Sequence, residues 1–500
     1  MACSKPSIIQ RLAAVSLSIV GLVMVLVWHV APAAGAAVQP PVDQLSRVIT
    51  GNVDQVPLTL TVGLEGVLQS DRATAARPAA GEAVYRQFLP MVAYHYGSSP
   101  ALFGVQNYYA LTPQYGFTRI VESKVSWVRF PVYWSSVESA NTTPANYNWS
   151  GADTSLLAVK NTSANLVVTL AGNPGWAASS VNGPVYNLAD LQEFVGAIVA
   201  RYPHVKYWEF YNEPDNEMWY GQQGAAYATM LRTMYPVVKA ANPSAHVVMG
   251  GLALDWFSDN GGPFDRNFLR DVLANCSGPC FDVANFHYYP AFRSSWESYG
   301  RDIIGKANYV RQMLATYHYE RPIFTTETAW PSATTWGSPE LQARYVPKVY
   351  VRSLAADLPV TIWFSLFDAD YSDSGLLDDQ LTPRPAYAAM RALINTMPRP
   401  HYMRTIPVSE TGSASIEAYQ FSVLGQSGPE RLDVYWYDCP SMATYGQYPA
   451  DCANSAAVRV KAPQVARIDK LGNRTTLYAA ADGYVTLNVQ SSPIYIDYTP

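Results

Sequence analysis

The chain has 500 residues, of which 49% are apolar and only 15% are charged, and its formal net charge is −5. This length suits one large domain with a smaller one, or a few of ordinary size, and the apolar fraction is ample for a sizeable core. No block of Lys and Arg occurs, so the composition argues against nucleic acid as a partner, because phosphate binding needs clustered basic side chains.

The first 36 residues have the pattern of a secretory signal peptide. Lys5 and Arg11 supply positive charge, an apolar run follows over residues 12–30, and the small residues of APAAGAA predict cleavage after Ala36. A run of 19 apolar residues is also long enough to span a bilayer, so a retained membrane anchor is the alternative. Residues 37–98, rich in Ala, Pro and Gly, are predicted to form an N-terminal arm or linker.

Eight short apolar runs follow from about residue 100. They are ALFGVQ (101–106), VSWVRF (125–130), NLVVTL (165–170), VKYWEF (205–210), HVVMGG (246–251), FDVANF (281–286), PIFTTE (322–327) and VTIWFS (360–365). From the second run onward their starts lie 35 to 41 residues apart. A strand and a helix repeated at this period predict an α/β fold, a (β/α)8 or TIM barrel over residues 99–398. An open doubly wound sheet is the alternative, but ALFGVQNYY lacks the glycine-rich loop typical of that fold.

Two of the stretches between these runs have clear helical periodicity. In residues 187–202 the apolar side chains fall on one face, and Asn187 is the expected N-cap. Residues 341–358 are similar, and Pro347 is expected to bend or begin that helix.

The helical period is absent after about residue 400. Six short β-rich runs, from AYQFSVLG to IYIDY, are separated by Gly, Asn, Asp and Pro. This pattern predicts a small antiparallel β-sandwich over residues 399–500.

Four cysteines remain beyond the signal segment, in two local pairs. The simplest pairing in an oxidising compartment is Cys276–Cys280 and Cys439–Cys452. Zinc is the alternative, but the two pairs are far apart in the sequence and lack C-x-x-C spacing or a flanking His. The cysteines therefore agree with export to an extracellular location.

Two carboxylates stand where predicted strands end, which is where TIM-barrel active sites lie. Glu213 follows the fourth run in FYNEPD, and Glu327 ends the seventh in IFTTETAW, three βα units later. In an eight-fold ring this spacing brings the two side chains to opposite sides of a narrow mouth. Glycosidic bond cleavage needs such a pair, one to protonate the leaving oxygen and one to attack the anomeric carbon or activate water. No His pair at i, i+4 accompanies them, so neither a metal nor another cofactor is predicted.

Further side chains at the strand ends have both functional and structural interpretations. Arg129 is expected to keep a nearby carboxylate ionised, or to form a structural ion pair. His287 and Tyr289 share a strand face and are expected to hydrogen-bond to the acid or the nucleophile, although His287 can equally be a satisfied buried histidine. Trp363 is expected either to floor a sugar ring or to belong to the barrel core.

Four more tryptophans follow strand ends and are expected to stack on sugars or to pack within loops, namely Trp134, Trp176, Trp219 and Trp330. The other carboxylates near Glu213 receive structural interpretations. Glu209 alternates with Phe210 and is expected to face a helix. Asp215 and Glu217 are expected to be solvated charges on the loop.

These residues resemble clan A of the glycoside hydrolases, a group of retaining enzymes on (β/α)8 barrels. Asn212-Glu213-Pro214 matches the clan's Asn-Glu-Pro at the fourth strand, and Glu327 in TTET matches its nucleophile at the seventh. The resemblance implies that Glu213 is the acid/base, that Glu327 is the nucleophile, and that Asn212 binds the substrate 2-hydroxyl.

The other residues at the barrel mouth indicate which family of the clan the chain resembles most. His287 and Tyr289 as H-x-Y, with Arg129 and Trp363, look like other mouth residues of the clan, as in families 5 and 39. Family 5 usually has a His at the end of the third strand, where this chain reads LAGNPGW. A family 39-like relative is therefore favoured, Asn173 has no assigned role, and the β-rich tail resembles the accessory sandwich of family 39.

The resemblance covers about residues 100–398 and implies a secreted retaining hydrolase whose partner is a β-linked carbohydrate. One rival is a non-catalytic glycan-binding surface protein, which should lack one of the two glutamates. A second rival is an inverting hydrolase, whose carboxyl groups stand further apart.

Overall fold

The computed structural model describes residues 102–217, 223–333, 337–368, 373–425, 428–439 and 445–498. The predicted signal peptide, the N-terminal arm and Trp219 lie outside these residues. No helix within the described ranges is long and apolar enough to cross a membrane.

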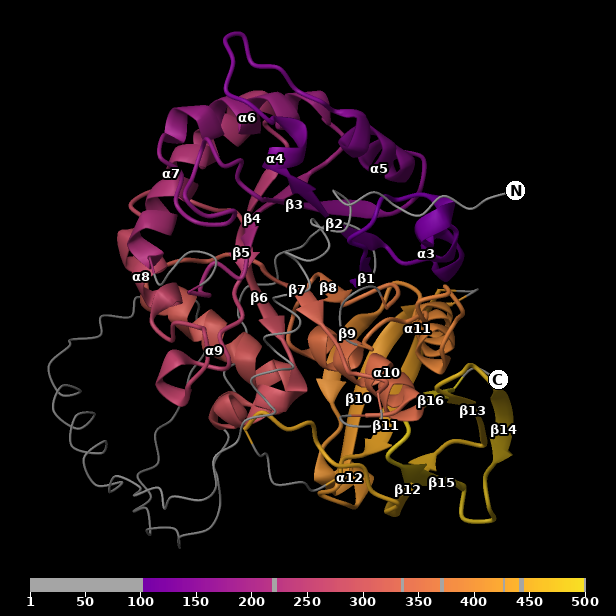
Figure 1. The fold of residues 1–500 in the computed structure, drawn as a ribbon. Coiled ribbons are helices and arrows are strands. Elements are labelled where there is room, and N and C mark those ends of the chain that lie inside the picture. The colour runs from indigo at the N-terminus through magenta and orange to yellow at the C-terminus, as the bar shows by residue number, and fades with distance from the viewer. Residues whose placement is uncertain are drawn as a thin grey trace, which may run out of the picture. The chain divides into compact units, whose positions relative to one another are not determined.

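Eight parallel strands form a ring, in the spatial order β5-β4-β3-β2-β1-β8-β7-β6 (Figure 1). Isolated bridges Val248–Val283 and Leu252–Phe286 join β5 to β6 and complete the ring. The predicted (β/α)8 barrel is confirmed, because each of the eight predicted runs overlaps one of these strands. They are β1 (Phe103–Gln106), β2 (Trp127–Tyr133), β3 (Asn165–Ala171), β4 (Tyr207–Asn212), β5 (His246–Gly251), β6 (Ala284–Tyr288), β7 (Ile323–Thr328) and β8 (Thr361–Trp363).

Helices lie outside the ring of strands (Figure 1). They are α3 (Phe117–Ser123), α4 (Trp134–Val137), α5 (Ser150–Lys160), α6 (Leu188–Arg201), α7 (Gly224–Ala241), α8 (Phe268–Asn275), α9 (Ile303–Thr316), α10 (Pro339–Ala355) and α11 (Pro385–Thr396), with short 3-10 turns at Pro113–Tyr115, Ser258–Asn260, Pro290–Ser295 and Glu297–Tyr299.

Both helices predicted from periodicity are present. Helix α6 begins directly after Asn187, whose side chain accepts the Ala189 N–H as expected of an N-cap. Helix α10 begins at Pro339 after its cap Ser338, so Pro347 lies inside the helix and does not begin it.

The interior of the barrel changes from apolar to polar along the strands. Near the strand starts a separate apolar cluster fills it, made of Trp127, Val167, Val248, Val283, Phe324, Val360 and Ile362. Tyr207 of β4 packs against this cluster. Alternate residues of a strand share a face. Two positions beyond Trp127, Val167, Tyr207, Val283 and Phe324 come buried polar residues, namely Arg129, Thr169, Glu209, Asn285 and Thr326. The apolar cluster is therefore the floor on which a polar layer sits.

The C-terminal part is a β-sandwich, as predicted. A six-stranded sheet in the order β14-β13-β16-β11-β10-β9 packs against the pair β12-β15, and every pairing is antiparallel. The strands are β9 (His401–Thr405), β10 (Ile416–Leu424), β11 (Pro429–Tyr437), β12 (Ser455–Lys461), β13 (Gln464–Asp469), β14 (Arg474–Tyr478), β15 (Tyr484–Gln490) and β16 (Ile494–Asp497), with α12 (Val408–Thr411) after β9. Strands β9 and β13 were not among the predicted runs. Both predicted disulfides, Cys276–Cys280 and Cys439–Cys452, are present.

The two faces of the larger sheet have different partners. On β10, Ile416 and Ala418 join the core of the sandwich, whereas Tyr419 and Phe421 join the core that includes the barrel helices. On the barrel side, Arg352 of α10 donates two hydrogen bonds to Glu417, at 2.9 and 2.7 Å, and lies 2.7 Å from Asp302. All three side chains are buried, so a satisfied ionic cluster holds the sandwich to helix α10.

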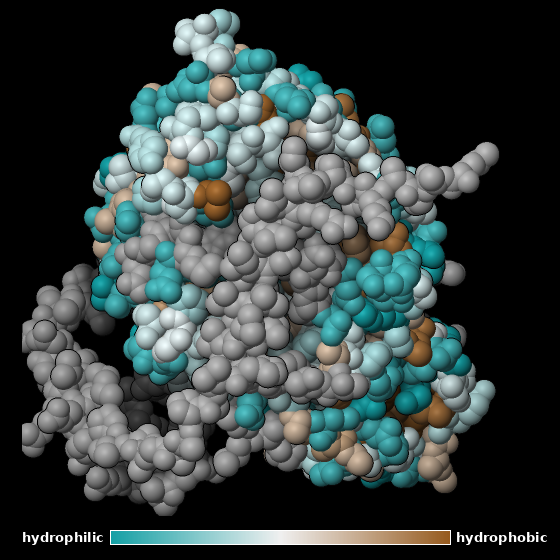
Figure 2. Space-filling view, in the orientation of Figure 1, coloured by the Kyte–Doolittle hydropathy of each residue, from teal (hydrophilic) through white to brown (hydrophobic). Residues whose placement is uncertain are grey.

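The described surface in Figure 2 is mostly hydrophilic, with hydrophobic residues in isolated spots. The large exposed apolar side chains come from separate elements, for example Val121, Leu157 and Tyr478. Single exposed apolar residues of this kind are normal on a folded domain and mark no binding face.

Candidate active site

The polar layer at the top of the barrel is organised by an ion pair between Arg129 of β2 and Glu209 of β4. The guanidinium donates to both carboxylate oxygens, at 2.7 and 3.0 Å, and both side chains are buried. The carboxylate also accepts hydrogen bonds from Thr169 at 2.6 Å, Gly251 N at 3.0 Å, Asn285 at 2.8 Å and Thr326 at 3.0 Å. The expectation that Glu209 faces a helix is wrong, because it points into the barrel.

The ion pair is ionised on both sides. Burial opposes charge on Glu209, but the Arg129 charge and its hydrogen bonds outweigh burial and lower the pKa of Glu209. Burial likewise acts to lower the pKa of Arg129, and the charges of Glu209 and Glu327 hold that pKa above its usual value. The same guanidinium donates to Gln106 at 2.6 Å, to Asn212 at 2.6 Å and to Glu327 at 3.2 Å.

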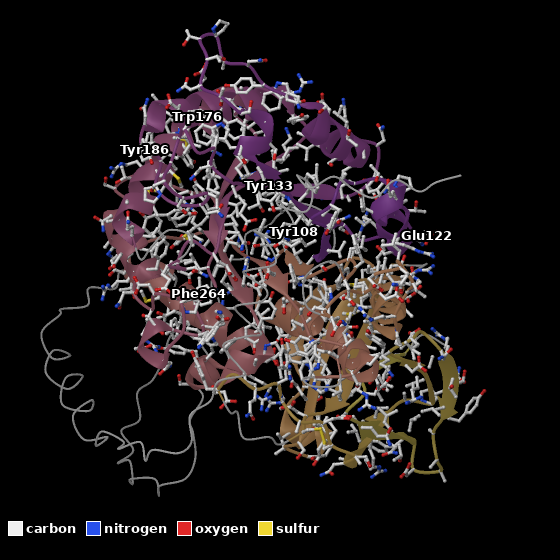
Figure 3. The ribbon with its side chains drawn as sticks, viewed as in Figure 1. Tyr108, Glu122, Tyr133, Trp176, Tyr186 and Phe264 are labelled. Carbon is white, nitrogen blue, oxygen red and sulfur yellow. A yellow bond between two sulfur atoms is a disulfide. The ribbon has the colours of Figure 1, made fainter. Side chains whose placement is uncertain are left out.

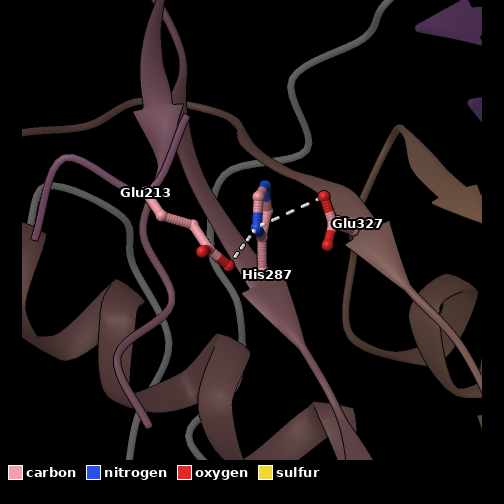
Figure 4. A group of neighbouring side chains, drawn as sticks. All are labelled: Glu213, His287 and Glu327. Carbon is pink, nitrogen blue, oxygen red and sulfur yellow. Dashed lines mark hydrogen bonds and ion pairs between the residues drawn. The ribbon is translucent and has the colours of Figure 1, made fainter. Parts of the chain in front are cut away.

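Glu213, His287 and Glu327 lie close together at the barrel mouth (Figure 4), and Arg129 of the ion pair donates to Glu327. His287 Nδ1 is 3.0 Å from Glu213 Oε1 and 3.7 Å from Glu327 Oε2. One atom of each side chain lies within 4.8 Å of the others, so the two carboxylates approach each other to less than that distance. The two glutamates that the sequence singled out are therefore brought together, with the imidazole between them.

Local backbone irregularities aim both glutamates at the mouth. The pairing of β7 with its neighbours shifts register within residues 325–328, and this bulge allows consecutive residues Thr326 and Glu327 both to approach His287. Glu213 has a φ of 46°, in the left-handed region, and its backbone N–H donates to Gly251 O at 3.0 Å. Non-glycine residues adopt this conformation at a cost, and they cluster at functional sites.

The two glutamates have different surroundings. Both oxygens of Glu327 accept hydrogen bonds, one from the Tyr289 hydroxyl and one from Arg129. Burial raises the pKa of Glu327 above its usual value and Glu213 adds to the effect, whereas His287, Arg129 and Tyr289 act in the other direction. Burial raises the pKa of Glu213 to about 7, against smaller opposing effects of Arg129 and Lys306. Burial lowers the pKa of His287 to about 4, so the imidazole is neutral near pH 7.

The cluster of Glu213, His287 and Glu327 has the donor types and spacing of a possible cation site. However, Tyr289 and Arg129 already donate to the two oxygens of Glu327. A cation there would also sit beside the Arg129 charge, which repels it. Both observations disfavour a cation at this cluster.

Asn212 is half-buried at the end of β4, beside Glu213. Its Oδ1 accepts from Arg129 at 2.6 Å, which fixes the orientation of the amide and directs Nδ2 away from the guanidinium. Binding of a substrate hydroxyl by Asn212, as predicted, would need its side-chain amide to be held in a fixed orientation, as it is here by Arg129. Its role in binding stays a prediction.

The loop after β4 is tied to the loop after β5 by Asp215. This side chain is fully buried and accepts the N–H groups of Ala253 at 3.0 Å and Leu254 at 2.8 Å. Burial raises its pKa to about 8. The expectation of a solvated charge is wrong for Asp215, because two backbone donors compensate its burial, whereas Glu217 is exposed as expected.

Most of the predicted tryptophan platforms are buried. Trp363 is 0% exposed and donates its indole N–H to Ser374 O at 2.9 Å, and Trp134 is 1% exposed and stacks on Phe194. Trp330 is 6% exposed. Trp176, labelled in Figure 3, is half-buried and contacts Trp134 edge-on. Trp134 therefore packs within the fold, as one of its two interpretations stated.

Sequence reasoning missed two aromatic residues at the mouth. Tyr108 follows β1 by two residues, and Tyr133 is the last residue of β2. Both are half-buried and are labelled in Figure 3. The Arg129 charge acts on the pKa of Tyr133, and Tyr108 acts on that of Arg129, which places both rings near the polar layer. Their position at the ends of predicted strands could have identified both tyrosines as candidate site residues. Asn173 is structural, because it donates to Ser180 O and Gly183 O and accepts from Tyr211.

Comparison with known proteins finds similarity of fold without similarity of sequence. No family model matches the chain, and no curated protein matches it. Among solved structures, a family 39 glycoside hydrolase from the gut symbiont Bacteroides cellulosilyticus WH2 superposes with a TM-score of 0.61 and 18% identity, over 80% of this chain and 81% of that one.

Two further solved structures are similar over 80% of this chain and 96% of their own. A GH39 β-xylosidase from Caulobacter crescentus has a TM-score of 0.53 at 14% identity, and a glucosidase from Croceicoccus marinus has 0.52 at 16%. At these identities the likeness establishes the fold. The chain has the architecture of these glycoside hydrolases, in agreement with the expected resemblance to clan A.

Replacing Glu209 by Gln should lower the free energy of unfolding by about 3–5 kcal/mol, because Arg129 would keep a buried charge without its partner. Glu217→Gln is the matched control, since that side chain is exposed, and it should change stability by less than about 0.5 kcal/mol. Denaturant unfolding of both variants measures the difference. Equal stabilities would show that the ion pair does not organise the barrel.

Proposed function

We propose that this protein is a secreted retaining glycoside hydrolase that cleaves β-glycosidic bonds in a poly- or oligosaccharide by double displacement. The observation that carries the proposal is the approach of the Glu213 and Glu327 carboxylates to within 4.8 Å, from the C-terminal ends of β4 and β7. Retaining enzymes hold their two carboxyl groups about 5–5.5 Å apart, whereas inverting enzymes leave about 6.5–9.5 Å for a water molecule.

In the first step Glu213, protonated, gives its proton to the glycosidic oxygen while Glu327 attacks the anomeric carbon. The bond to the leaving sugar breaks, and a covalent glycosyl–enzyme ester forms. In the second step Glu213 takes a proton from water, the water oxygen attacks the anomeric carbon, and Glu327 leaves as a carboxylate. Both glutamates return to their starting protonation states.

The surroundings of the two glutamates support this division of roles. A pKa of about 7 keeps a large fraction of Glu213 protonated at neutral pH, as a proton donor requires. Glu327 faces the Arg129 charge at 3.2 Å and the Tyr289 hydroxyl, and both stabilise its carboxylate form. Arg129 also orients Asn212, which we assign to the substrate 2-hydroxyl.

Similar folds and the cysteines support the substrate class and the location. The similar solved structures include a β-xylosidase and a glucosidase, and this chain has both glutamates at the barrel mouth. A non-catalytic glycan-binding protein has no need of both. The two disulfides fit an oxidising compartment, as does the predicted signal peptide.

Glu327→Gln should abolish turnover with the fold intact, because the covalent intermediate cannot form. Glu213→Gln should slow substrates with poor leaving groups by about 100-fold or more and activated aryl glycosides much less, because only the former need a proton donor. Rates on the two substrate types and the circular dichroism of each variant measure this, with Glu217→Gln as the control. Full activity in either variant would contradict the proposal.

The first product released from a β-linked substrate should be the β-anomer. Double displacement inverts the anomeric carbon twice and so retains its configuration. Proton NMR of the reaction in its first minutes, before mutarotation, distinguishes the anomers. Initial formation of the α-anomer would contradict a retaining mechanism.

The value of kcat/KM should fall as the pH rises through about 7, because Glu213 loses the proton that it must donate. It should also fall on the acidic side as Glu327 becomes protonated. With an activated aryl glycoside, Glu213→Gln should remove the basic limb of the profile. Asp215→Asn is the control, since Asp215 titrates nearby, and this variant should keep that limb. If Asp215→Asn removes the basic limb instead, the limb reports the titration of Asp215, and the assignment to Glu213 is contradicted.

A further inference from the structure

The connection between β11 and β12 of the sandwich reaches the loops of the barrel. Its described part that contacts the barrel, residues 445–452, is here called the cross-domain segment. The disulfide Cys439–Cys452 closes its base, because Cys439 follows β11 by two residues and Cys452 precedes β12 by three. Asp451 binds Arg344 of α10 at 2.6 Å, which holds the same end against the barrel.

The front of the cross-domain segment bonds to the loops after β5 and β6. The Tyr445 hydroxyl accepts the Phe257 N–H at 3.0 Å, and Gly446 N donates to Ala291 O at 2.9 Å. The Tyr445 ring also meets Phe292 edge-on, with centroids 5.3 Å apart. The two hydrogen bonds are made to backbone groups of the loops, so they fix the segment against these loops.

The Tyr448 end of the cross-domain segment packs on the loop that follows Glu327. The Tyr448 ring is 5.0 Å from that of Trp330, which follows Glu327 by three residues. Tyr448 also contributes to raising the pKa of Tyr289, after burial and Glu327, and Tyr289 is the residue that donates to Glu327. Tyr448 is half-buried, so part of its surface remains accessible.

We propose that the cross-domain segment forms the wall of the sugar-binding site over β5, β6 and β7, with Tyr448 contacting a sugar unit beyond the one whose anomeric carbon is attacked. This inference rests on the proposed glycosidase function. A half-buried tyrosine suits the role, because it offers a flat apolar face and a hydroxyl to a ligand that has both apolar ring faces and hydroxyl edges. The C-terminal sandwich is then part of the substrate site, and it restricts which oligosaccharides enter.

A segment that only joined two domains would have different consequences. Its loss would lower stability and leave substrate preference unchanged. A wall of the binding site would affect substrates in proportion to the number of sugar units that reach it. A small aryl glycoside and an oligosaccharide are therefore the two substrates that separate these cases.

The test compares Tyr448→Ala in the full chain with Tyr478→Ala, an exposed tyrosine on β14 that is distant in sequence from the segment. For Tyr448→Ala we expect KM on a β-linked xylo- or gluco-oligosaccharide to rise roughly two- to tenfold, the range of one aromatic contact, with kcat on an aryl glycoside changed less than about twofold. Tyr478→Ala should behave as wild type. Tyr448→Leu, which keeps apolar contact with Trp330, replaces the alanine variant if that variant does not fold.

Equal proportional changes on both substrates, or a lower melting temperature with KM unchanged, would overturn the inference and leave the glycosidase proposal intact. If wild type hydrolyses neither substrate, the glycosidase proposal fails on its own. Calorimetric titration of the same oligosaccharides then tests separately whether the segment lines the binding site. A lower affinity of Tyr448→Ala than of wild type supports this inference. Equal affinities, or no binding to wild type, overturn it.

Discussion

The buried ion pair between Arg129 and Glu209 is the interaction on which the rest of the site depends. An ionised pair inside a barrel is tolerated only when its remaining hydrogen-bonding capacity is met. Glu209 meets this condition with partners on β2, β3, β5, β6 and β7, and Arg129 extends the network to β1 and to Asn212 on β4. Seven strand ends are thus held in register by one charge pair, above an apolar floor that excludes water from below.

The same network creates the difference between the two proposed catalytic carboxylates. Arg129 turns one guanidinium edge to Glu209 and the other toward Glu327, so Glu327 has a positive neighbour at 3.2 Å. Glu213 sits on the far side of a neutral imidazole, where burial dominates and its pKa rises. Two identical side chains therefore have different surroundings: Arg129 and Tyr289 act to lower the pKa of Glu327 against its burial, whereas burial raises the pKa of Glu213 to about 7. A general acid and a nucleophile in one site require such a difference.

The sandwich is fixed to the barrel and sends a segment of chain to the barrel mouth. Arg352 and Glu417 bind it to helix α10 through a buried bidentate ion pair, and the disulfide-closed segment after β11 reaches the loops beyond β5, β6 and β7. The first contact fixes the position of the sheet, and the second extends from the sheet to the barrel mouth. Rigid attachment at α10 is what would allow a distant loop to shape the site reproducibly.

The sequence was enough to predict the eight strands, the sandwich, both disulfides and the pairing of Glu213 with Glu327, because these depend on local periodicity and on spacing in an eight-fold ring. It did not determine which face of β4 points inward. A strand buried on both sides is apolar on both sides, so WEFY gave no indication that Glu209 lies inside and that Arg129 would be its partner. Contacts between segments far apart in the chain bury Asp215 and Trp134, produce the bulge that aims Glu327, and bring Tyr448 to Trp330. No local sequence pattern encodes such contacts, so they become visible only in the folded chain.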